Sequence, residues 1–555
     1  MKRNLNAITN NIYDILVVGG GMYGCCVAWE ASLRGLSVAL VEKGDFCSAT
    51  SANSLKMIHG GLRYLQNADF KRMRESIAER KTLLRIAPHL VHPLPVMIPT
   101  YGHGMKGKEA LGLAMALNDL ISCDRNFQQD PQKYIPNGRT ISPEACLDLL
   151  PGIPTQGLTG GALFCDAQAY NSERLALAFL QSAANAGAEL ANYVEVLGFL
   201  KEGDRISGVQ AKDVLTGNRF DIRAKTVVNT TGPWIGRLLG PIAHERSQPE
   251  VPLAMGMNLV TRPLFENYAV GISSPKSYQD ANAVIHKGSR FLFVVPWRGK
   301  SMIGTYYAPY DQSPDDFQVS EAQITQFLNE INRALPSANL TLEEVEFVQS
   351  GLLPRTGIDA KSGEPQLAKH YQIYEQPGLL SVVGVKYTTA RDVAEKVIDR
   401  VFKAWGQRPP KSLSSVTPLD GGDIQKFGNF LEKAISQKSD ELDEPIVRSL
   451  VYNYGSNYPN VLQDLDEITT QTNQEMAVLK AEVLYAIKEE MAQTLSDVVF
   501  RRTELGTAGH PGDRALNTCA ETMATELGWS RSKLEQELQD VLVHFPRSPK
   551  LIPVQ

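Results

Sequence analysis

The sequence has few of the features that mark secreted, membrane-spanning or nucleic-acid-binding proteins. Its 7 cysteines are an odd number without C-x-x-C spacing, which argues against a disulfide framework or a metal site and favours reduced thiols in the cytoplasm. No run reaches about 18 consecutive apolar residues, so we expect no membrane-spanning helix. The polar opening segment MKRNLNAITNNIYD is a poor signal peptide. The net charge of −5 and the pI of about 6.1 argue against a nucleic-acid partner but allow a local basic pocket for an anionic substrate.

The sequence does contain enough apolar material for several folded cores. It has 555 residues, of which 43% are hydrophobic and 21% charged, close to the usual composition of soluble proteins. At about 100–200 residues per domain, this length predicts two to four domains.

The first predicted unit is a strand at 13–18, a glycine-rich turn, a helix at 22–35 and a second strand at 37–42. The turn reads Gly19-x-Gly21-x-x-Gly24. Its first glycine permits a tight turn, its second lets the backbone approach a pyrophosphate, and its third permits close helix packing. Glu42 ends the second strand, where it is placed to accept hydrogen bonds from a ribose hydroxyl. The pattern predicts a dinucleotide-binding βαβ unit, but the motif does not choose between FAD and NAD.

Later segments predict further helices and strands. Residues 88–99 contain four prolines, so we expect them to be extended or turning. A linker rich in Pro, Gly and Ser at 406–423 precedes a mostly helical region from about 424 to about 543. The other predicted elements are helices at 69–86, 108–122 and 172–188, a hairpin at 204–230 that turns at 216–218, strands at 291–297 and 301–307, and a strand, turn and helix at 378–402.

Two of these later segments favour FAD over NAD. Residues 224–239 form a strand and a turn containing Gly232, similar to the late strand that returns to the cofactor in FAD-dependent oxidoreductases of the two-dinucleotide-fold type. Gly384-x-Lys386 stands where such folds close over the flavin ring. No second G-x-G-x-x-G unit for NAD(P)H is visible, so we expect the electrons to come from the substrate itself.

Several segments also carry a resemblance to one family. The most specific are HGGLRYL, within 47–70, and the GxKxTT block within 381–391. Segments 87–99, 293–305, 450–456 and 481–506 agree with them, and together they resemble FAD-dependent glycerol-3-phosphate dehydrogenases over about residues 13–530. The resemblance implies oxidation of sn-glycerol 3-phosphate to dihydroxyacetone phosphate, with FAD taking the hydride and a quinone or other acceptor reoxidising it.

The resemblance also implies roles for individual residues. A phosphate dianion needs fixed cationic donors, and the substrate hydroxyl needs a proton acceptor, for which His59 is the nearest candidate. The candidate catalytic residues are His59, Arg63 and Lys386. The candidate substrate ligands are Arg63, Tyr64, Arg355 and Lys386. The candidate cofactor ligands are Gly19, Gly21, Gly24, Glu42, Thr50, Ser51, Ser54, Lys56, His59, Gly60, Gly232 and Gly384.

The sequence departs from the family pattern in the expected substrate domain. Leu353 stands where the family has an arginine, and Asn258 where it has a histidine. Lys369 replaces a further arginine, and Tyr306 a threonine. Arg355 or Lys369 could restore the missing positive charge. Two alternatives therefore stay open: a related flavin oxidoreductase acting on another hydroxy acid, polyol phosphate or amine, and a flavin-binding protein without a working substrate site.

The expected fold is α/β, with a two-dinucleotide-fold (Rossmann-like) FAD-binding domain, a sheet-based substrate domain and a helical C-terminal domain. The FAD-binding domain would combine residues 10–90, 155–240 and 370–405. The substrate domain would combine 91–154 and 241–369, and the helical domain would span 411–555. We expect a cytoplasmic protein. The helix at 108–122 leaves peripheral contact with the inner face of the membrane open against a buried core helix, and oligomerisation is also left open.

Overall fold

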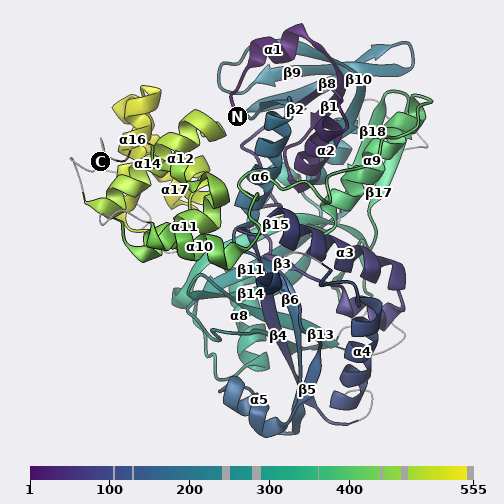
Figure 1. Ribbon diagram of the computed structural model, residues 1–555, viewed down its shortest axis with the longest axis vertical. Helices are drawn as coiled ribbons and strands as arrows, with labels where there is room; N and C mark the ends of the chain where they lie inside the picture. The colour runs from purple at the N-terminus through teal and green to yellow at the C-terminus, as the bar shows by residue number, and fades with distance from the viewer. Residues whose placement is uncertain are drawn as a thin grey trace.

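The computed structural model consists of two β-sheets and a C-terminal group of helices (Figure 1). It describes residues 1–546 except 104–106, 128–129, 240–250, 278–288, 361, 385, 438–441, 464 and 466–472. For a few further residues it describes the backbone but not the side chain: Arg63, Gln66, Asn67, Lys276, Ser277, Ser289 and Arg290.

The first sheet has eight strands around a parallel centre. β1 (Ile12–Val18) pairs with β2 (Val38–Val41) on one side and β10 (Arg219–Asn229) on the other. β7 (Glu189–Ala191) and β18 (Leu379–Val383) extend this parallel core. The antiparallel strands of this sheet are β17 (Gln372–Gln376), β8 (Val194–Glu202) and β9 (Arg205–Asp213).

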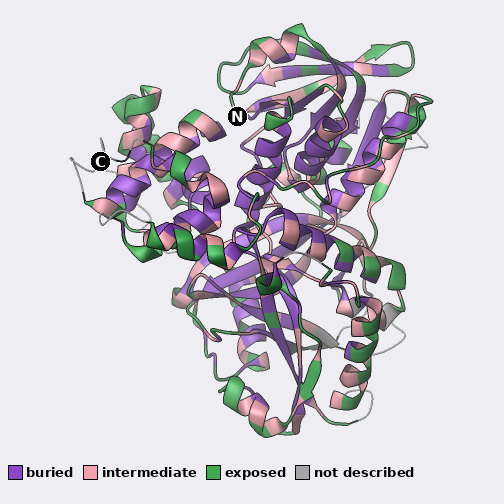
Figure 2. Ribbon diagram, viewed as in Figure 1, coloured by how far each residue is buried: buried purple, intermediate pink, exposed green. Residues whose placement is uncertain are grey.

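Three helices bury their apolar residues together beside this sheet, as parallel strands require crossovers. α2 (Met22–Leu33) packs against both α6 (Ser172–Asn185) and α9 (Ala390–Ala404). Most of α2 is buried, which explains why it shows no polar face. Figure 2 shows these helices as largely buried segments next to the sheet. The helix N-termini of this layer therefore stand at the carboxyl ends of the strands, where ligands of such folds bind.

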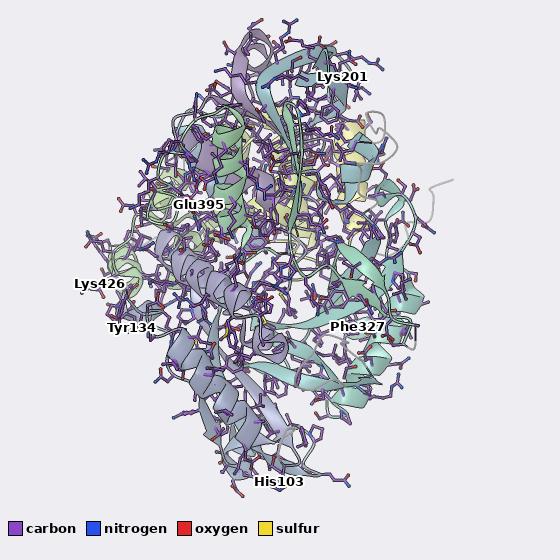
Figure 3. All side chains as sticks on the ribbon, turned by 90° about the vertical axis from the view of Figure 1, so that its right-hand side faces the viewer. His103, Tyr134, Lys201, Phe327, Glu395 and Lys426 are labelled. Carbon is purple, nitrogen blue, oxygen red and sulfur yellow. The ribbon has the colours of Figure 1, made fainter. Side chains whose placement is uncertain are left out.

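The second sheet has ten strands in the order β16-β15-β11-β14-β13-β12-β4-β6-β3, with β5 paired to β6. Figure 3 shows Lys201 of β8 near the top of the molecule and Phe327 of α8 (Glu321–Ala334) in its lower half. The strands are β3 (Met57–Ile58), β4 (Val91–Tyr101), β5 (Arg139–Ile141), β6 (Leu158–Ala169), β11 (Leu253–Thr261), β12 (Ala269–Ser277), β13 (Ser289–Trp297), β14 (Lys300–Tyr310), β15 (Val345–Ile358) and β16 (Pro365–Leu367).

Most of the proline-rich segment at 88–99 belongs to β4, an interior strand of the second sheet. The sequence predicted extended or turning chain here but not a strand inside a sheet. β4 pairs with β6 along its whole length but with β12 only at Val96 and Met97. Pro93, Pro95 and Pro99 occupy alternate positions, so the N–H groups that they lack fall on one edge of the strand. The sheet tolerates them because that edge carries few hydrogen bonds.

The remaining helices surround the sheets or form the C-terminal domain. Figure 1 shows the C-terminal helices as one group beside the two sheets. Their apolar residues share a core with Trp297 and Phe347 of the second sheet. Among the described residues, the other helices are α1 (Leu5–Asn10), η1 (Leu62–Asn67), α3 (Phe70–Ile86), α4 (Lys108–Ile121), η3 (Pro131–Lys133), α5 (Pro143–Leu149), η4 (Gly232–Trp234), α7 (Ile235–Leu239), η6 (Pro314–Asp316), η7 (Leu342–Glu344), α10 (Phe427–Ser436), α11 (Glu444–Tyr454), η8 (Gly455–Asn457), α12 (Tyr458–Val461), α14 (Gln474–Glu490), α15 (Leu495–Asp497), η9 (Val498–Arg502), α16 (Asp513–Leu527) and α17 (Arg531–Leu542).

The α/β fold expected from the sequence is confirmed, and for one of the expected domain boundaries we propose a change. Residues 155–169 were assigned to the FAD-binding domain, whereas β6 lies inside the second sheet. β3 belongs to the second sheet as well, although it directly precedes His59. A boundary near residue 170 fits the sheets better, because α6 begins there and returns the chain to the first sheet. The division into domains otherwise remains a proposal.

Candidate active site

A large cavity of about 1340 Å³ lies between the two sheets. The glycine-rich turn, the loop at 47–56 and the end of β18 line it from the first sheet, and β11, β14 and β15 line it from the second. The predicted site residues that line it are Gly19, Gly21, Glu42, Thr50, Ser51, Ser54, Lys56, His59, Tyr64, Gly232, Gly384 and Lys386. The structure therefore brings together segments that are up to several hundred residues apart in the chain.

The glycine-rich turn fits a dinucleotide. Gly19 has a φ of +102°, and a Cβ there would lie 2.9 Å from the carbonyl oxygen of Thr230. A Cβ on Gly24 would lie only 1.9 Å from the carbonyl oxygen of Gly19. Gly24 is thus a packing residue that lies behind the turn, while Gly21 lines the cavity and begins α2. The N-terminus of α2 is suited to a pyrophosphate.

Glu42 stabilises this turn and also faces the cavity. Its Oε2 accepts a hydrogen bond from the Gly20 N–H at 2.7 Å, and its Oε1 accepts one from the Gly44 N–H at 2.9 Å. Burial raises the pKa of the Glu42 carboxyl, and the two backbone N–H groups oppose that rise. The position agrees with the predicted ribose contact, and the two backbone bonds show a second, structural role.

The loop at 47–56 is tied to both sheets. Thr50 accepts a hydrogen bond from the Leu352 N–H at 3.1 Å and donates one to the Leu352 carbonyl oxygen at 3.0 Å. The Ser51 hydroxyl accepts from the N–H of Met22 at 2.9 Å, at the start of α2. Ser54 accepts from the Lys56 N–H at 3.1 Å. These bonds hold the loop in place along the cavity wall.

Lys56, a predicted cofactor ligand, lines the cavity, but its ammonium group is engaged elsewhere. Its ammonium is fully buried and lies 2.7 Å from the carboxylate of Glu173, at the start of α6. It also donates to the Ser172 hydroxyl at 3.0 Å. Burial lowers the pKa of Lys56, although Glu173 opposes the change. Because a buried charge must be paired, the charge of Lys56 stabilises the protein instead of facing the cavity.

Gly60, another predicted cofactor ligand, is not among the described residues that line the cavity. Its N–H donates to the Asp166 carboxylate at 2.6 Å, and a Cβ there would lie 2.4 Å from the guanidinium of Arg80. Arg80 in turn binds Asp166. Gly60 is therefore packed against a buried ion pair, and the neighbouring His59 lines the cavity.

Tyr64, Lys386 and His59 form the chemically richest part of the cavity wall. The Lys386 ammonium donates a hydrogen bond to the Tyr64 hydroxyl and lies 4.0 Å from the centre of its ring. The His59 and Tyr64 rings pack edge-to-face, with their centres 5.8 Å apart. The predicted Arg63 lies in η1 next to Tyr64, but its side chain is outside the described part of the chain.

Two residues that the sequence did not single out complete this group. Arg72, at the start of α3, lies 4.4 Å from the centre of the Tyr64 ring and lines the cavity. Tyr23 of α2 donates to the Lys386 carbonyl oxygen at 2.9 Å and accepts from its N–H at 3.2 Å. A Cβ on Gly384 would collide with the Tyr23 ring at 2.3 Å. The sequence predicted only the helix at 69–86 that carries Arg72, and no pattern indicated Tyr23.

The substrate side of the cavity differs from what the sequence suggested for Arg355. Its guanidinium donates to Asp311 at 2.5 Å and to the Leu253 carbonyl oxygen at 2.8 Å. Arg355 is not among the described residues that line the cavity, so it does not replace the missing arginine there. Lys369, Leu353 and Asn258 do line it. Tyr306 is buried beside Phe327 instead, with its hydroxyl 3.0 Å from Gln326.

Fold and site together define a dinucleotide-binding flavoprotein oxidoreductase. The family model for FAD-dependent oxidoreductases matches residues 14–390, and the model for the C-terminal domain of alpha-glycerophosphate oxidase matches residues 412–534. The chain belongs to the family of FAD-dependent glycerol-3-phosphate dehydrogenases. The family match confirms the prediction of FAD as the cofactor.

Individual relatives resemble the chain over nearly its full length. It is 33% identical to the glycerol-3-phosphate dehydrogenase of Synechocystis sp., covering 97% of both chains. It is 31% identical to the mitochondrial enzyme of Mus musculus, covering 95% of this chain and 72% of that protein. The solved structure of the glycerol-3-phosphate dehydrogenase from Bacillus halodurans, complexed with FAD, is 25% identical and has a TM-score of 0.77 over 99% of this chain and 98% of that one.

Proposed function

We propose that this protein oxidises sn-glycerol 3-phosphate to dihydroxyacetone phosphate and uses bound FAD as the electron acceptor. The observation that carries the proposal is the group of Lys386, Tyr64 and Arg72 on the wall of a cavity that begins at the glycine-rich turn. Two cations beside a phenol suit a phosphorylated substrate. The relatives named above, which carry the name glycerol-3-phosphate dehydrogenase, support the same substrate.

The residues of the first sheet would hold the cofactor. The N–H groups at the start of α2 bind the pyrophosphate, and Glu42 binds a ribose hydroxyl. Thr50, Ser51, Ser54, Gly232 and Gly384 line the rest of the cofactor side of the cavity. FAD, when bound, supplies the chemistry by which the substrate carbon loses a hydride.

The residues at the other end of the cavity would hold the substrate. Lys386, a cation held in place by Tyr64, binds the phosphate. Arg63 and Arg72 lie close to Tyr64 in the sequence, in η1 and at the start of α3. His59 accepts the proton of the substrate hydroxyl, because it lines the cavity beside Tyr64. Lys369 adds a positive charge on the side of the second sheet, where the family arginine is missing.

A second candidate function is the oxidation of another hydroxy acid, polyol phosphate or amine by the same cofactor. Leu353 and Asn258 favour it, because both line the cavity at positions where the family has a charged or titratable side chain. Arg355 cannot compensate while it is paired with Asp311. The two candidate functions use the same flavin and differ in the substrate that binds beside Leu353 and Asn258.

Anaerobic titration of the holoprotein with glycerol 3-phosphate tests the first candidate directly. We expect the long-wavelength absorbance band of FAD to bleach. The same titration is repeated with a panel of other hydroxy acids, polyol phosphates and amines. A flavin that stays oxidised with glycerol 3-phosphate but is bleached by one of these compounds would favour the second candidate over the first. A flavin that none of these compounds reduces would contradict both.

We also propose that the electrons pass to a quinone or another acceptor at a membrane surface. No helix among the described residues is long and apolar enough to cross a bilayer. α4 and the segment after it nevertheless expose large apolar side chains: Leu113 is 74% exposed, Leu120 72% and Phe127 75%. Such a patch marks a contact surface. Peripheral attachment to the inner face of the membrane is the arrangement that we propose for it.

A further inference from the structure

Asp45 connects the loop beside the glycine-rich turn to the C-terminal domain. It follows β2, and it is only 2% exposed. Arg502 donates to both of its carboxylate oxygens at 2.7 Å, and the Nε of Arg501 donates to one of them. The residues are 456 and 457 positions apart in the chain. A buried carboxylate that binds one arginine bidentately and a second through Nε is among the stronger polar contacts in proteins.

The two arginines are fixed as firmly as the carboxylate. Arg502 is fully buried and also donates to the Glu490 carbonyl oxygen at 2.9 and 3.1 Å. Arg501 donates to Asp497 at 2.7 Å. Burial alone would raise the pKa of the Asp45 carboxyl, but the two guanidinium groups outweigh it and hold that pKa below its ordinary value. Asp45 is therefore a charged, fully paired anchor.

The rest of the same loop faces the FAD cavity. Lys43, Gly44, Cys47 and Ser48 line it. The Cys47 N–H donates to the Gly20 carbonyl oxygen at 3.0 Å, and Glu42 accepts hydrogen bonds from Gly20 and Gly44 as described above. The loop thus binds the C-terminal domain on one side and the glycine-rich turn on the other.

We propose that Asp45, Arg501 and Arg502 are positioning residues for FAD: through Asp45, the C-terminal domain fixes the loop at 42–48 in the shape that holds the cofactor. None of the three is among the described residues that line the cavity, so they act through the loop and do not touch FAD. The inference concerns affinity for the cofactor, and it is independent of which substrate is oxidised.

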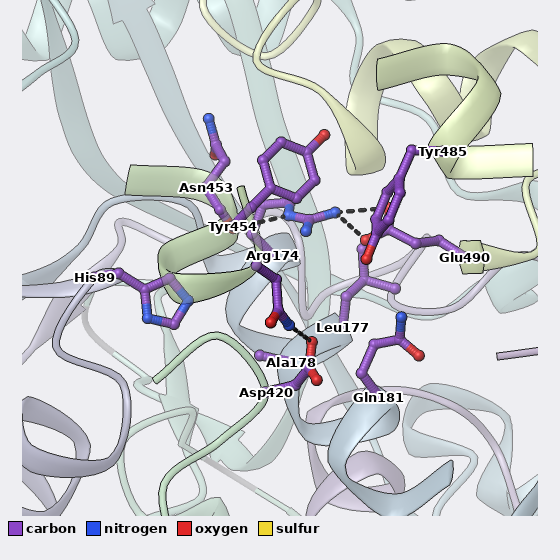
Figure 4. A pocket seen from close by; sticks show the side chains of 11 residues that line it. His89, Arg174, Leu177, Ala178, Gln181, Asp420, Asn453, Tyr454, Tyr485 and Glu490 are labelled. Carbon is purple, nitrogen blue, oxygen red and sulfur yellow. Dashed lines mark hydrogen bonds and ion pairs between the residues drawn. The ribbon is translucent and has the colours of Figure 1, made fainter. Parts of the chain in front are cut away.

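A second ion pair across the same domain boundary provides a matched control. Arg174 of α6 donates to both carboxylate oxygens of Glu490, at 2.7 and 2.8 Å (Figure 4). This pair is also buried, with 7% and 1% of the two side chains exposed. The Glu490 side chain binds Arg174, whereas its carbonyl oxygen binds Arg502. Glu490→Gln therefore weakens the docking of the C-terminal domain and leaves Asp45 with both of its arginines.

The test is FAD affinity, measured by quenching of flavin fluorescence when the apoprotein of each variant is titrated with FAD. We expect Asp45→Asn to raise the Kd for FAD about ten-fold or more. The free-energy cost of breaking a buried ion pair is several times larger than the cost of a ten-fold change in Kd. We expect Glu490→Gln to lower the unfolding temperature but change the Kd less than about two-fold. At saturating FAD, the KM for glycerol 3-phosphate should be unchanged in both.

Two results would overturn the proposal: an unchanged Kd in Asp45→Asn, or an equal rise of the Kd in Glu490→Gln, which would make domain docking in general the cause. Arg501→Lys keeps the charge and the Arg502 pair, and it serves where Asp45→Asn does not fold. We expect it to raise the Kd in the same direction by a smaller factor, and an unchanged Kd would overturn the proposal. The fluorescence measurement needs no substrate, so its outcome is separate from that of the flavin bleaching experiment.

Discussion

The ammonium of Lys386 donates a hydrogen bond to the hydroxyl of Tyr64, although the two residues are 322 positions apart. Lys386 follows β18 of the first sheet, and Tyr64 lies in η1 between the two sheets. Both residues line the cavity, and Tyr23 of α2, which follows the glycine-rich turn, binds the backbone of Lys386. The hydrogen bond to Tyr64 holds the lysine charge in place before any ligand arrives, which favours phosphate binding because less side-chain entropy is lost.

Replacement of Lys386 by methionine tests this arrangement. The variant keeps a long apolar stem but removes the charge, so we expect kcat/KM for glycerol 3-phosphate to fall on the order of 100-fold. FAD content should stay at the wild-type level, because the side chain lies on the substrate side. Steady-state kinetics with flavin absorbance on the same samples provides both values.

Arg355→Met is the matched control for Lys386→Met. Arg355 carries the same type of charge and was a predicted substrate ligand, but its guanidinium binds Asp311 outside the cavity. We expect its kcat/KM to remain within about two-fold of the wild type, since partly exposed ion pairs contribute little. A large loss in Arg355→Met together with a small loss in Lys386→Met would reverse the assignment of the phosphate ligand.

Replacement of His59 by asparagine tests the proton acceptor. The amide preserves a hydrogen-bonding side chain beside Tyr64 but cannot accept the substrate proton, so we expect the rate of flavin reduction to fall by about 10²–10⁴-fold. Stopped-flow absorbance under anaerobic conditions measures that step apart from reoxidation. Reduction at the wild-type rate, with FAD still bound, would exclude His59 as the base.

The sequence predicted the cofactor side of this site better than the substrate side. Gly19, Gly21 and Glu42 follow one another within a single βαβ unit, and local spacing is sufficient to place them. Arg355 and Lys56 illustrate the limit, because their roles depend on partners that are remote in the chain, Asp311 and Glu173. A pattern of residue types shows that a charge is present, but only the fold shows which charge is already paired.

The same argument applies to the fold. The long periodic segment α3 was predicted almost to its ends, α9 was predicted as the helix that ends the segment 378–402, and the hairpin of β9 and β10 turns where Gly217 permits a φ of +80°. The sequence could not show that β6, within the predicted FAD-binding segment 155–240, joins the second sheet, because strand order is a long-range property. The sequence of β6 does not reveal that its partner is β4.

Glu482 predicts a pH dependence of stability. It lies on α14 with its carboxylate 3.1 Å from the Tyr454 hydroxyl, and burial raises its pKa from 4.5 to about 7. The folded state therefore favours the protonated form. This contribution is fully present below the unfolded pKa of about 4.5 and is lost as the pH rises through about 7.

Glu482→Gln should remove that dependence, because a neutral amide retains a partner for Tyr454. Between pH 4.5 and pH 8 we expect the variant to gain stability relative to the wild type, by at most about 3 kcal/mol since the side chain is only partly shielded from water. Denaturant unfolding at both pH values measures the change. The exposed Glu475 of the same helix is the control, and Glu475→Gln should show no such difference. An equal stability difference at both pH values would contradict the assignment.

The exposed leucines of α4 predict attachment to lipid. Leu113 and Leu120 are 74% and 72% exposed, although Leu113 also lines the cavity, and both would bury apolar area when a surface covers them, at about 25 cal/mol per Å². We expect Leu113→Gln/Leu120→Gln to weaken cosedimentation with vesicles of phosphatidylcholine and phosphatidylglycerol by about ten-fold or more. The control is Val214→Gln/Leu215→Gln, which removes two exposed apolar side chains from the β9–β10 turn and should bind vesicles as the wild type does.

If both double variants bind equally well, α4 is not the contact surface. If only the α4 variant is released but flavin reduction by substrate is unchanged, attachment serves the delivery of electrons and not their removal from the substrate.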